Sequence, residues 1–293
     1  MANLEMAESL LRVGVPIGFA AYGELLLERA GIVNLGIEGK FLLGACLGWL
    51  LTSVTGHPLV GLISVIIMGA LLGGIFWFLI DVMECSQHVV GLGMGFSATG
   101  IALTLYRMVP AEIKDSSLPY TGWEIASLIV LAVLLFAGFI LLAIFFTRTG
   151  KGLSWVLVGE DARAADILGV PVRLIRIGAS VTGTILFFIA GWILSVLVAR
   201  NFTLGLVSGR GWLALCLVIL AGWRPLGVTL AVVLWSILDV SQFAAQGAGM
   251  PIPYELILTV PYCVCIFAVT GFLPRHRAPT MLLKTYNRNE DAA

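Results

Sequence analysis

Long apolar runs dominate the pattern of hydrophobic and polar positions along this chain. Asp, Glu, Lys and Arg are all absent from residues 41–80, 85–106, 125–147, 177–199 and 256–274. A helix that crosses the hydrocarbon of a bilayer needs about 20 apolar residues, and the first run is long enough for two crossings. The pattern therefore predicts an all-α fold, a polytopic bundle of transmembrane helices that includes broken helices.

Turn signals divide these runs into about nine spans. His57-Pro58 and Arg224-Pro225 mark two turns, and the polar stretch 109–123 is a loop. The spans are expected near residues 8–27, 35–54, 58–82, 88–108, 124–147, 176–199, 210–222, 226–245 and 253–272. The seventh is short enough to be a half-helix. We expect residues 1–293 to form a single transmembrane domain.

Composition agrees with a membrane protein and excludes other classes. Hydrophobic residues make up 59% of the chain and charged residues 12%, against about 25% charged in soluble domains. The 34 glycines suit close helix packing. A formal net charge of zero leaves no basic face for nucleic acid. The acidic start MANLEMAESL lacks the basic region of a signal peptide, so no cleavage is expected.

Basic residues predict the orientation of the bundle. They cluster in the central loop 148–176 and in the C-terminal tail 274–293, and four predicted crossings separate the two regions. Short cytoplasmic loops carry an excess of Lys and Arg. We therefore expect both regions to be cytoplasmic and the N-terminus to lie outside.

The central loop contains a charged segment that is expected to form one short helix. Glu160 and Asp161 would lie in its first turn, where the helix dipole favours anions. Ala164, Ile167 and Leu168 would form one apolar stripe. Elsewhere on its surface lie Asp161, Arg163 and Asp166, and the helix would end at a left-handed Gly169 before Pro171. Such a helix could rest on lipid headgroups, but its mixed charges favour a protein partner.

Three segments resemble the permeases of ABC importers, in particular the branch that serves simple sugars and nucleosides. GEDARAADILGVPV, residues 159–172, resembles the cytoplasmic coupling segment of that branch. ERAGIVNLGIEGKFLLGA, residues 28–45, resembles the early motif of nucleoside-type permeases, and GRGWLALCLVILAGWRPLG, residues 209–227, resembles their late segment. The resemblance covers nearly the whole chain and implies a transmembrane permease subunit in the bacterial inner membrane.

The resemblance also implies partners and contact residues. The partners would be a second homologous permease in a heterodimer, two ATPase subunits that use ATP and Mg, and an extracytoplasmic binding protein or lipoprotein. The residues expected to contact the ATPase are Glu160, Asp161, Arg163, Ala164, Ala165, Asp166, Ile167, Leu168 and Gly169. Many sugar permeases of this branch begin with an additional helix, and its absence here fits an outside N-terminus.

Catalytic motifs are missing from the sequence. A phosphate-binding P-loop reads G-x-x-x-x-G-K-[ST], but around Gly39-Lys40 this chain has Asn34 in place of the first Gly and Phe41 in place of the hydroxyl residue. The stretch GFSAT, residues 95–99, is not the nucleophile elbow of a hydrolase. The chain is therefore expected to be no enzyme and to hold no cofactor or metal.

Two sets of residues are candidates for the substrate path. Gly-rich interruptions at 31–48 and 205–222 form the kind of pair that marks a transport site, and the first carries Asn34 and Glu38. Glu38 could instead cap a helix or pair with Lys40 or Arg29. The fourth span provides the second set, Phe96, Ser97, Thr99 and Tyr106. Small hydroxyl residues also serve in helix packing, which is the competing interpretation.

Three classes of function compete. The first is an ATP-driven importer of a nucleoside or related small polar solute, with a simple sugar or a riboflavin-like ligand as alternatives. The second is a stand-alone secondary transporter, which needs buried ionisable groups; the candidates are Glu38, Asp81, Asp239 and Glu255. The third is a membrane scaffold or enzyme, for which the sequence shows no chemistry.

Overall fold

A computed structural model describes residues 2–114, 118, 122–247, 259, 263 and 278–284. Within these residues all regular elements are helices, and seven are long and apolar enough to cross a membrane. They are α1 (Ala2–Arg29), α2 (Ile37–Thr55), α3 (Pro58–Trp77) with its π-helical end η1 (Phe78–Val82), α4 (Gln87–Met108), α6 (Trp123–Arg148), α9 (Val172–Trp192) with its π-helical end η2 (Ile193–Val198), and α11 (Pro225–Gly247). The predicted polytopic helix bundle is confirmed.

Four shorter helices complete the described chain: α5 (Ala111–Lys114), α7 (Gly150–Glu160), α8 (Ala162–Ile167) and α10 (Arg210–Leu220). The seventh predicted span corresponds to α10, whose 11 residues make it the half-helix that its length allowed. The ninth predicted span, 253–272, lies outside the described residues apart from positions 259 and 263.

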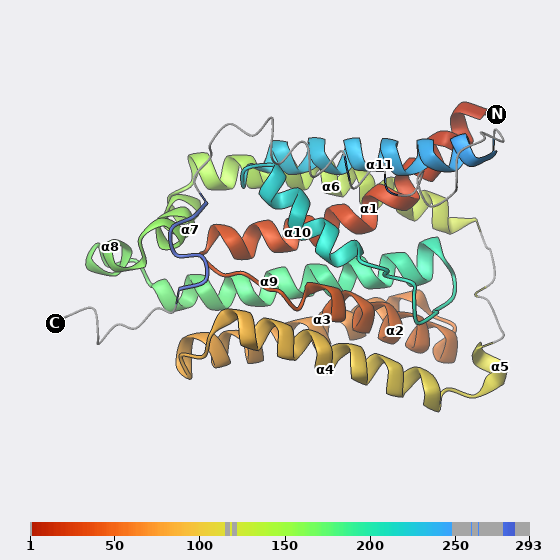
Figure 1. The fold of residues 1–293 in the computed structure, drawn as a ribbon, viewed down its shortest axis with the longest axis horizontal. Helices are drawn as coiled ribbons and strands as arrows, with labels where there is room; N and C mark the ends of the chain where they lie inside the picture. Colours follow the sequence, from red (N-terminus) through yellow and green to blue (C-terminus); the bar gives the residue numbers. More distant parts are fainter. Residues whose placement is uncertain are drawn as a thin grey trace.

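Helix α9 occupies the centre of the bundle and packs against α1, α2 and α3 (Figure 1). Glycines allow these helices to approach closely. A Cβ atom added at Gly23 would lie 2.6 Å from the carbonyl oxygen of Gly183, and one at Gly73 would lie 2.6 Å from that of Ser180. Small residues at such crossings let backbones pack without side chains between them.

Two helices begin inside the bundle rather than at its ends (Figure 1). After α1 ends at Arg29, residues 30–36 run without regular structure into the bundle, where α2 starts. In the second half of the chain, residues 199–209 return from the end of α9 to the point where α10 starts. Non-helical backbone at membrane depth is tolerated only where protein or a cavity satisfies it.

The central loop and the start of α1 lie at opposite ends of the molecule. Helices α7 and α8 and residues 278–284 lie together at one end, and α1 begins at the other end, where α5 also lies (Figure 1). The described part of the tail thus lies on the same side as the central loop, as expected. Which end faces the cytoplasm remains a prediction.

The charged segment forms the expected short helix, α8, but a second helix, α7, precedes it in the central loop. The Thr149 hydroxyl accepts the Gly152 N–H (3.0 Å) and starts α7 well before the charged segment. Glu160 is the last residue of α7, and Asp161 is extended (φ −152°) between the helices. The Asp161 carboxylate accepts the Ala164 N–H (2.9 Å), so Asp161 caps α8 instead of lying in its first turn.

Candidate functional site

Glu38 joins the two helices that begin inside the bundle. It lies in the first turn of α2, and its carboxylate oxygens accept the backbone N–H groups of Gly209 (2.7 Å) and Gly211 (2.8 Å) at the start of α10. These donors belong to the unpaired N–H groups of a helix start, where the dipole favours a negative charge. Of the alternatives for Glu38, the structure supports a helix cap, and the helix that Glu38 caps is α10.

A buried polar network lies beside this contact. Asn34 is fully buried; its N–H donates to the Glu24 carboxylate (3.1 Å), and its side-chain oxygen accepts from Lys40 Nζ (2.9 Å) and Gly36 N–H (3.2 Å). The Lys40 ammonium, also fully buried, lies 4.2 Å from the centroid of the Phe76 ring. Asn34 therefore holds the non-helical segment 30–36 in place.

Sequence reasoning missed three members of this network. Glu24 and Glu28 are one turn apart in α1 and almost completely buried, and Glu28 accepts the indole N–H of Trp223. Lys40 was considered only as a partner for Glu38. The available signal was two acids four residues apart at the end of an apolar run, followed by a lysine in the next helix, because buried charges occur in compensating groups.

The structure does not bring the six predicted path residues into one site. Tyr106 packs against Trp49 and Phe202, with ring centroids 6.0 and 5.3 Å away. The Thr99 hydroxyl donates to the Gly95 carbonyl of its own helix (3.0 Å). The side chains of Phe96 and Ser97 are exposed on the surface of the bundle, and Phe96 is 74% exposed.

Helix α4 faces α2 with small residues. A Cβ atom added at Gly95 would lie 2.8 Å from Gly36 Cα, so the two backbones almost touch. Ala98 and Ala102 continue this buried face. Phe96 and Ser97 therefore belong to the opposite, uncovered face of α4, separate from the start of α2.

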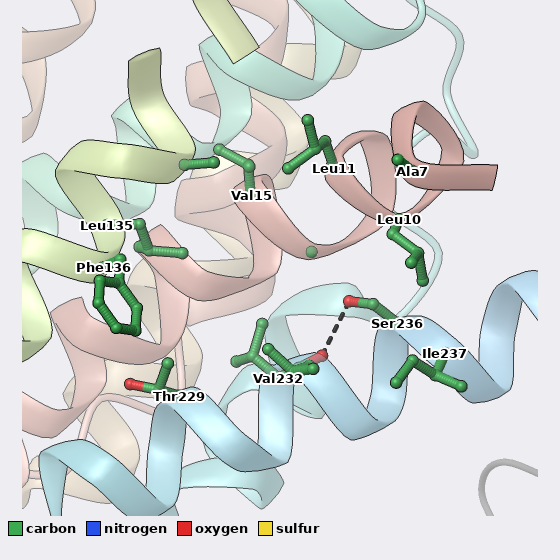
Figure 2. Close-up of a pocket in the computed structure, with 13 residues that line it drawn as sticks. Ala7, Leu10, Leu11, Val15, Leu135, Phe136, Thr229, Val232, Ser236 and Ile237 are labelled. Carbon is green, nitrogen blue, oxygen red and sulfur yellow. Dashed lines mark hydrogen bonds between the residues drawn. The ribbon is translucent and has the colours of Figure 1, made fainter. Parts of the chain in front are cut away.

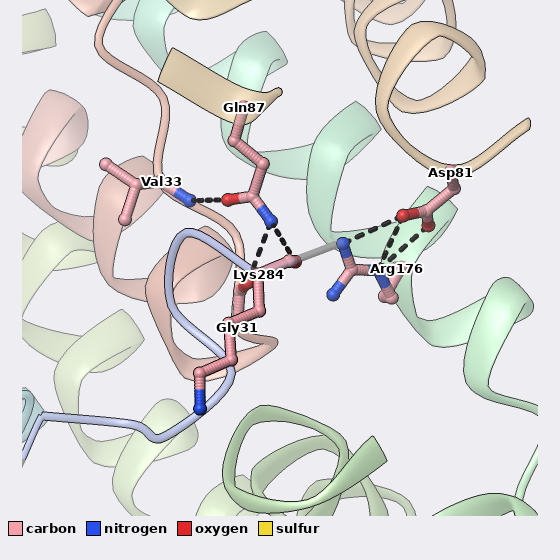
Figure 3. A network of polar contacts seen from close by, with 6 residues as sticks. All are labelled: Gly31, Val33, Asp81, Gln87, Arg176 and Lys284. Atoms are coloured by element: carbon pink, nitrogen blue, oxygen red, sulfur yellow. Dashed lines mark hydrogen bonds and ion pairs between the residues drawn. The ribbon is translucent and has the colours of Figure 1, made fainter. Parts of the chain in front are cut away.

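The described acids proposed for a secondary transporter are all engaged. Asp81 in η1 receives the Arg176 guanidinium from α9, with Nε 2.8 and 2.9 Å from its two carboxylate oxygens, and both side chains are fully buried (Figure 3). Asp239 accepts from the Gln242 amide (2.7 Å). Glu255 lies outside the described residues.

Helix α8 presents two uncovered apolar side chains at one end of the molecule. Ile167 is 78% exposed and Leu168 72% exposed. Gly169 has the predicted left-handed conformation (φ +78°), and the Val170 N–H closes the turn onto the Ala165 carbonyl (2.9 Å). The charged side chains Glu160, Asp161 and Arg163 are exposed around this pair, whereas Asp166 and Ala164 are partly buried.

Ala165 does not lie on this surface. It is fully buried in a small apolar cluster with Val158, Ala162 and Val172. Ala165 therefore belongs to the face by which α8 rests on the rest of the chain. A partner protein could contact Ala165 only if α8 moved away from the residues that cover it.

An apolar groove of about 400 Å³ lies between α1, α6 and α11 (Figure 2). Its polar lining groups are two hydroxyls that are already engaged: Ser236 donates to the Val232 carbonyl (2.8 Å), and Thr229 lies 2.7 Å from the Tyr22 hydroxyl. A polar solute needs free hydrogen-bonding groups. This groove is therefore a poor candidate for the substrate site.

Comparisons with known proteins place the chain among transport permeases. The family model described as branched-chain amino acid transport system, permease component, matches residues 6–269. A putative glucose ABC transporter permease of Haloferax volcanii, TsgC13, is 30% identical, and the alignment covers 99% of this chain and 97% of that protein.

Two further relatives come from bacteria. The guanosine ABC transporter permease NupQ of Bacillus subtilis is 27% identical, with 90% of each chain covered. The nucleoside ABC transporter permease NupC of Lactococcus lactis is 26% identical over 92% of this chain and 93% of its own. No solved structure matches this chain significantly.

Proposed function

This chain belongs to the family of branched-chain amino acid transport permease components, and we propose that it imports a nucleoside as one subunit of an ATP-driven transporter. It is a multi-pass membrane permease and a transport subunit rather than an enzyme. The observation that carries the proposal is the meeting of α2 and α10 inside the bundle, joined by Glu38. Broken helices of this kind mark substrate sites in transporters.

The proposed substrate path has two parts in this chain. One is the junction of Glu38 with the start of α10, where a substrate hydroxyl would compete with the Gly209 and Gly211 N–H groups for the Glu38 carboxylate. The other is the uncovered face of α4 with Phe96 and Ser97, which a second permease subunit would turn into a wall of the path. An aromatic ring beside a hydroxyl group suits a nucleobase with its ribose.

A simple sugar is the second candidate substrate. One observation favours it, because a relative that is 30% identical over nearly the whole chain is named as a putative glucose permease. Guanosine and glucose share hydroxyl groups but differ in the aromatic base. The two candidates therefore differ in their dependence on an aromatic side chain such as Phe96.

Coupling to ATP hydrolysis is assigned to α8. Its exposed pair Ile167 and Leu168 would enter a groove on a partner ATPase, which binds and hydrolyses ATP with Mg. Exposed charges such as Asp161 and Arg163 would select the correct partner at the rim. The end with α7, α8 and residues 278–284 would then be cytoplasmic, as the basic residues of the loop and tail predict.

Reconstitution of the chain with its co-expressed partners tests this function. We expect guanosine to stimulate ATP hydrolysis and to enter the vesicles, and glucose to do neither. If glucose but not guanosine stimulated ATP hydrolysis, the protein would be a sugar permease rather than a nucleoside permease. ATP binding by the purified permease without partners, or uptake that needs no ATP, would refute the importer assignment.

A further inference from the structure

The described part of the C-terminal tail, Ala278–Lys284, lies against the end of the bundle that carries α7 and α8 (Figure 1). The Met281 N–H donates to the Gly159 carbonyl (2.9 Å), and the Thr280 hydroxyl lies 3.3 Å from a carboxylate oxygen of Glu160. These contacts join segments about 120 residues apart at the last turn of α7. The tail is therefore packed against the element that leads into α8.

Met281 lies between α8 and the non-helical segment 30–36 that follows α1. Its side chain packs against the cluster of Val158, Ala162, Ala165 and Val172, which includes the buried face of α8. On the other side, a Cβ atom added at Gly31 would lie 2.7 Å from Met281 Cβ. Gly31 also has a positive φ of +76°, which favours glycine.

Gln87 ties the same tail to the non-helical segment before α2. Its side-chain oxygen accepts the Val33 N–H (3.0 Å), and its amide nitrogen donates to the carbonyls of Lys284 (2.8 Å) and Gly31 (3.4 Å) (Figure 3). Gln87 is 1% exposed, so water does not compete for these bonds. One amide group thus binds both the tail and the segment that positions α2.

We propose that residues 278–284 form a strap that positions α8 relative to the non-helical segment 30–36 between α1 and α2. Met281 and Gln87 are the positioning residues of this strap. The proposal rests on the proposed function, because it assumes that α8 receives the movement of the ATPase. A helix of six residues has little stability of its own, so its position depends on what supports its buried face. The strap supplies part of that support and connects it to segment 31–33, next to Asn34.

The strap predicts a selective loss of coupling. In the reconstituted complex, Met281→Ala and Gln87→Leu should lower the number of substrate molecules imported per ATP hydrolysed by about threefold or more. In Met281→Ala the amount of complex and the basal ATP hydrolysis should stay near wild type, because the exposed face of α8 is untouched. Met281→Leu, which keeps the volume, should retain the ratio. An unchanged ratio in both Met281→Ala and Gln87→Leu, or a loss of assembly with a normal ratio, would overturn the proposal.

Docking of the strap can be measured without partners or transport. In a chain whose native cysteines are replaced, a short bifunctional thiol reagent should cross-link Glu160→Cys with Thr280→Cys in detergent, and should not cross-link Ser154→Cys with Thr280→Cys. Failure of the first pair, or equal yields from both, would refute the strap regardless of function. Efficient cross-linking in a permease whose transport proves independent of ATP would instead refute the importer assignment.

Discussion

The interior around the start of α2 and the outer face of α8 each contain side chains that are exceptions to their surroundings. The two regions differ in whether those side chains have partners within the chain. Inside the bundle the exceptions are polar: Glu38, Asn34 and Lys40 each have a partner within the chain. On α8 the exceptions are apolar, since Ile167 and Leu168 are exposed at an end of the molecule. Satisfied polar groups hold a structure together, whereas uncovered apolar groups at a polar end indicate a surface for a partner.

The outer faces of α4 and α6 show a related difference. On α6 the exposed side chains are long and apolar, among them Val133, Phe136 and Leu141. The exposed face of α4 also carries apolar side chains such as Phe96 and Met108, but it adds the hydroxyl residues Ser97 and Thr104. Lipid tails suit the first face, whereas small and hydroxyl-bearing residues suit packing against another helix.

The largest effect is expected from removing a buried charge. Lys40→Met keeps the volume but leaves the Asn34 oxygen and the nearby Glu24 carboxylate without their cation. Leaving a buried hydrogen-bonding group without its partner costs about 1–3 kcal/mol, and more for a charged group, so the thermal unfolding midpoint in detergent should fall. Lys40→Met combined with Glu24→Gln should recover much of the loss. A normal midpoint for Lys40→Met alone would show that this network contributes nothing to stability.

The next effect concerns association rather than folding. Ile167→Asp with Leu168→Asp should reduce co-purification of the ATPase at least tenfold, because charges cannot enter an apolar groove without loss of hydration. The unfolding midpoint of the permease should remain unchanged, since both side chains are exposed. The matched control Ala165→Asp, at a fully buried position, should lower that midpoint. Normal ATPase binding by the double variant would remove α8 as the coupling element.

Glu38→Gln should have an intermediate effect. The amide has one oxygen, so it can accept from Gly209 or Gly211 but not from both through two oxygens. Loss of a charge-assisted hydrogen bond costs about 1.5–3 kcal/mol. We expect uptake to fall severalfold while membrane levels are largely kept. Uptake at the wild-type rate would show that Glu38 only caps a helix and has no role in transport.

The smallest effect is expected on the outer face of α4. Phe96→Leu should raise the substrate concentration for half-maximal uptake a few-fold without changing the unfolding midpoint, because Phe96 is 74% exposed. The matched control Phe136→Leu, on α6 where it lines the apolar groove, should leave the substrate concentration for half-maximal uptake unchanged. Equal behaviour of the two variants would show that the α4 face is no more functional than the lipid-facing surface of α6.

The sequence by itself determined the class of fold and the positions of the spans that lie within the described residues. Hydrocarbon thickness imposes a minimum length on every crossing helix, so charge-free runs such as 125–147 become helices such as α6 whatever surrounds them. Local chemistry also sufficed for the left-handed Gly169 and for the half-helix at 210–220. These features depend on neighbouring residues alone.

Only the tertiary structure decided which groups meet. Glu38 finds its partners 171 and 173 positions away in the chain, and nothing local distinguishes that cap from a pairing with Lys40 or Arg29. The burial of Ala165 depends on Val172 and Met281, and the network around Asn34 depends on Glu24 in another helix. Periodicity identifies the helices, but the partners of a buried polar group are set by how those helices cross, which the sequence of one segment does not contain.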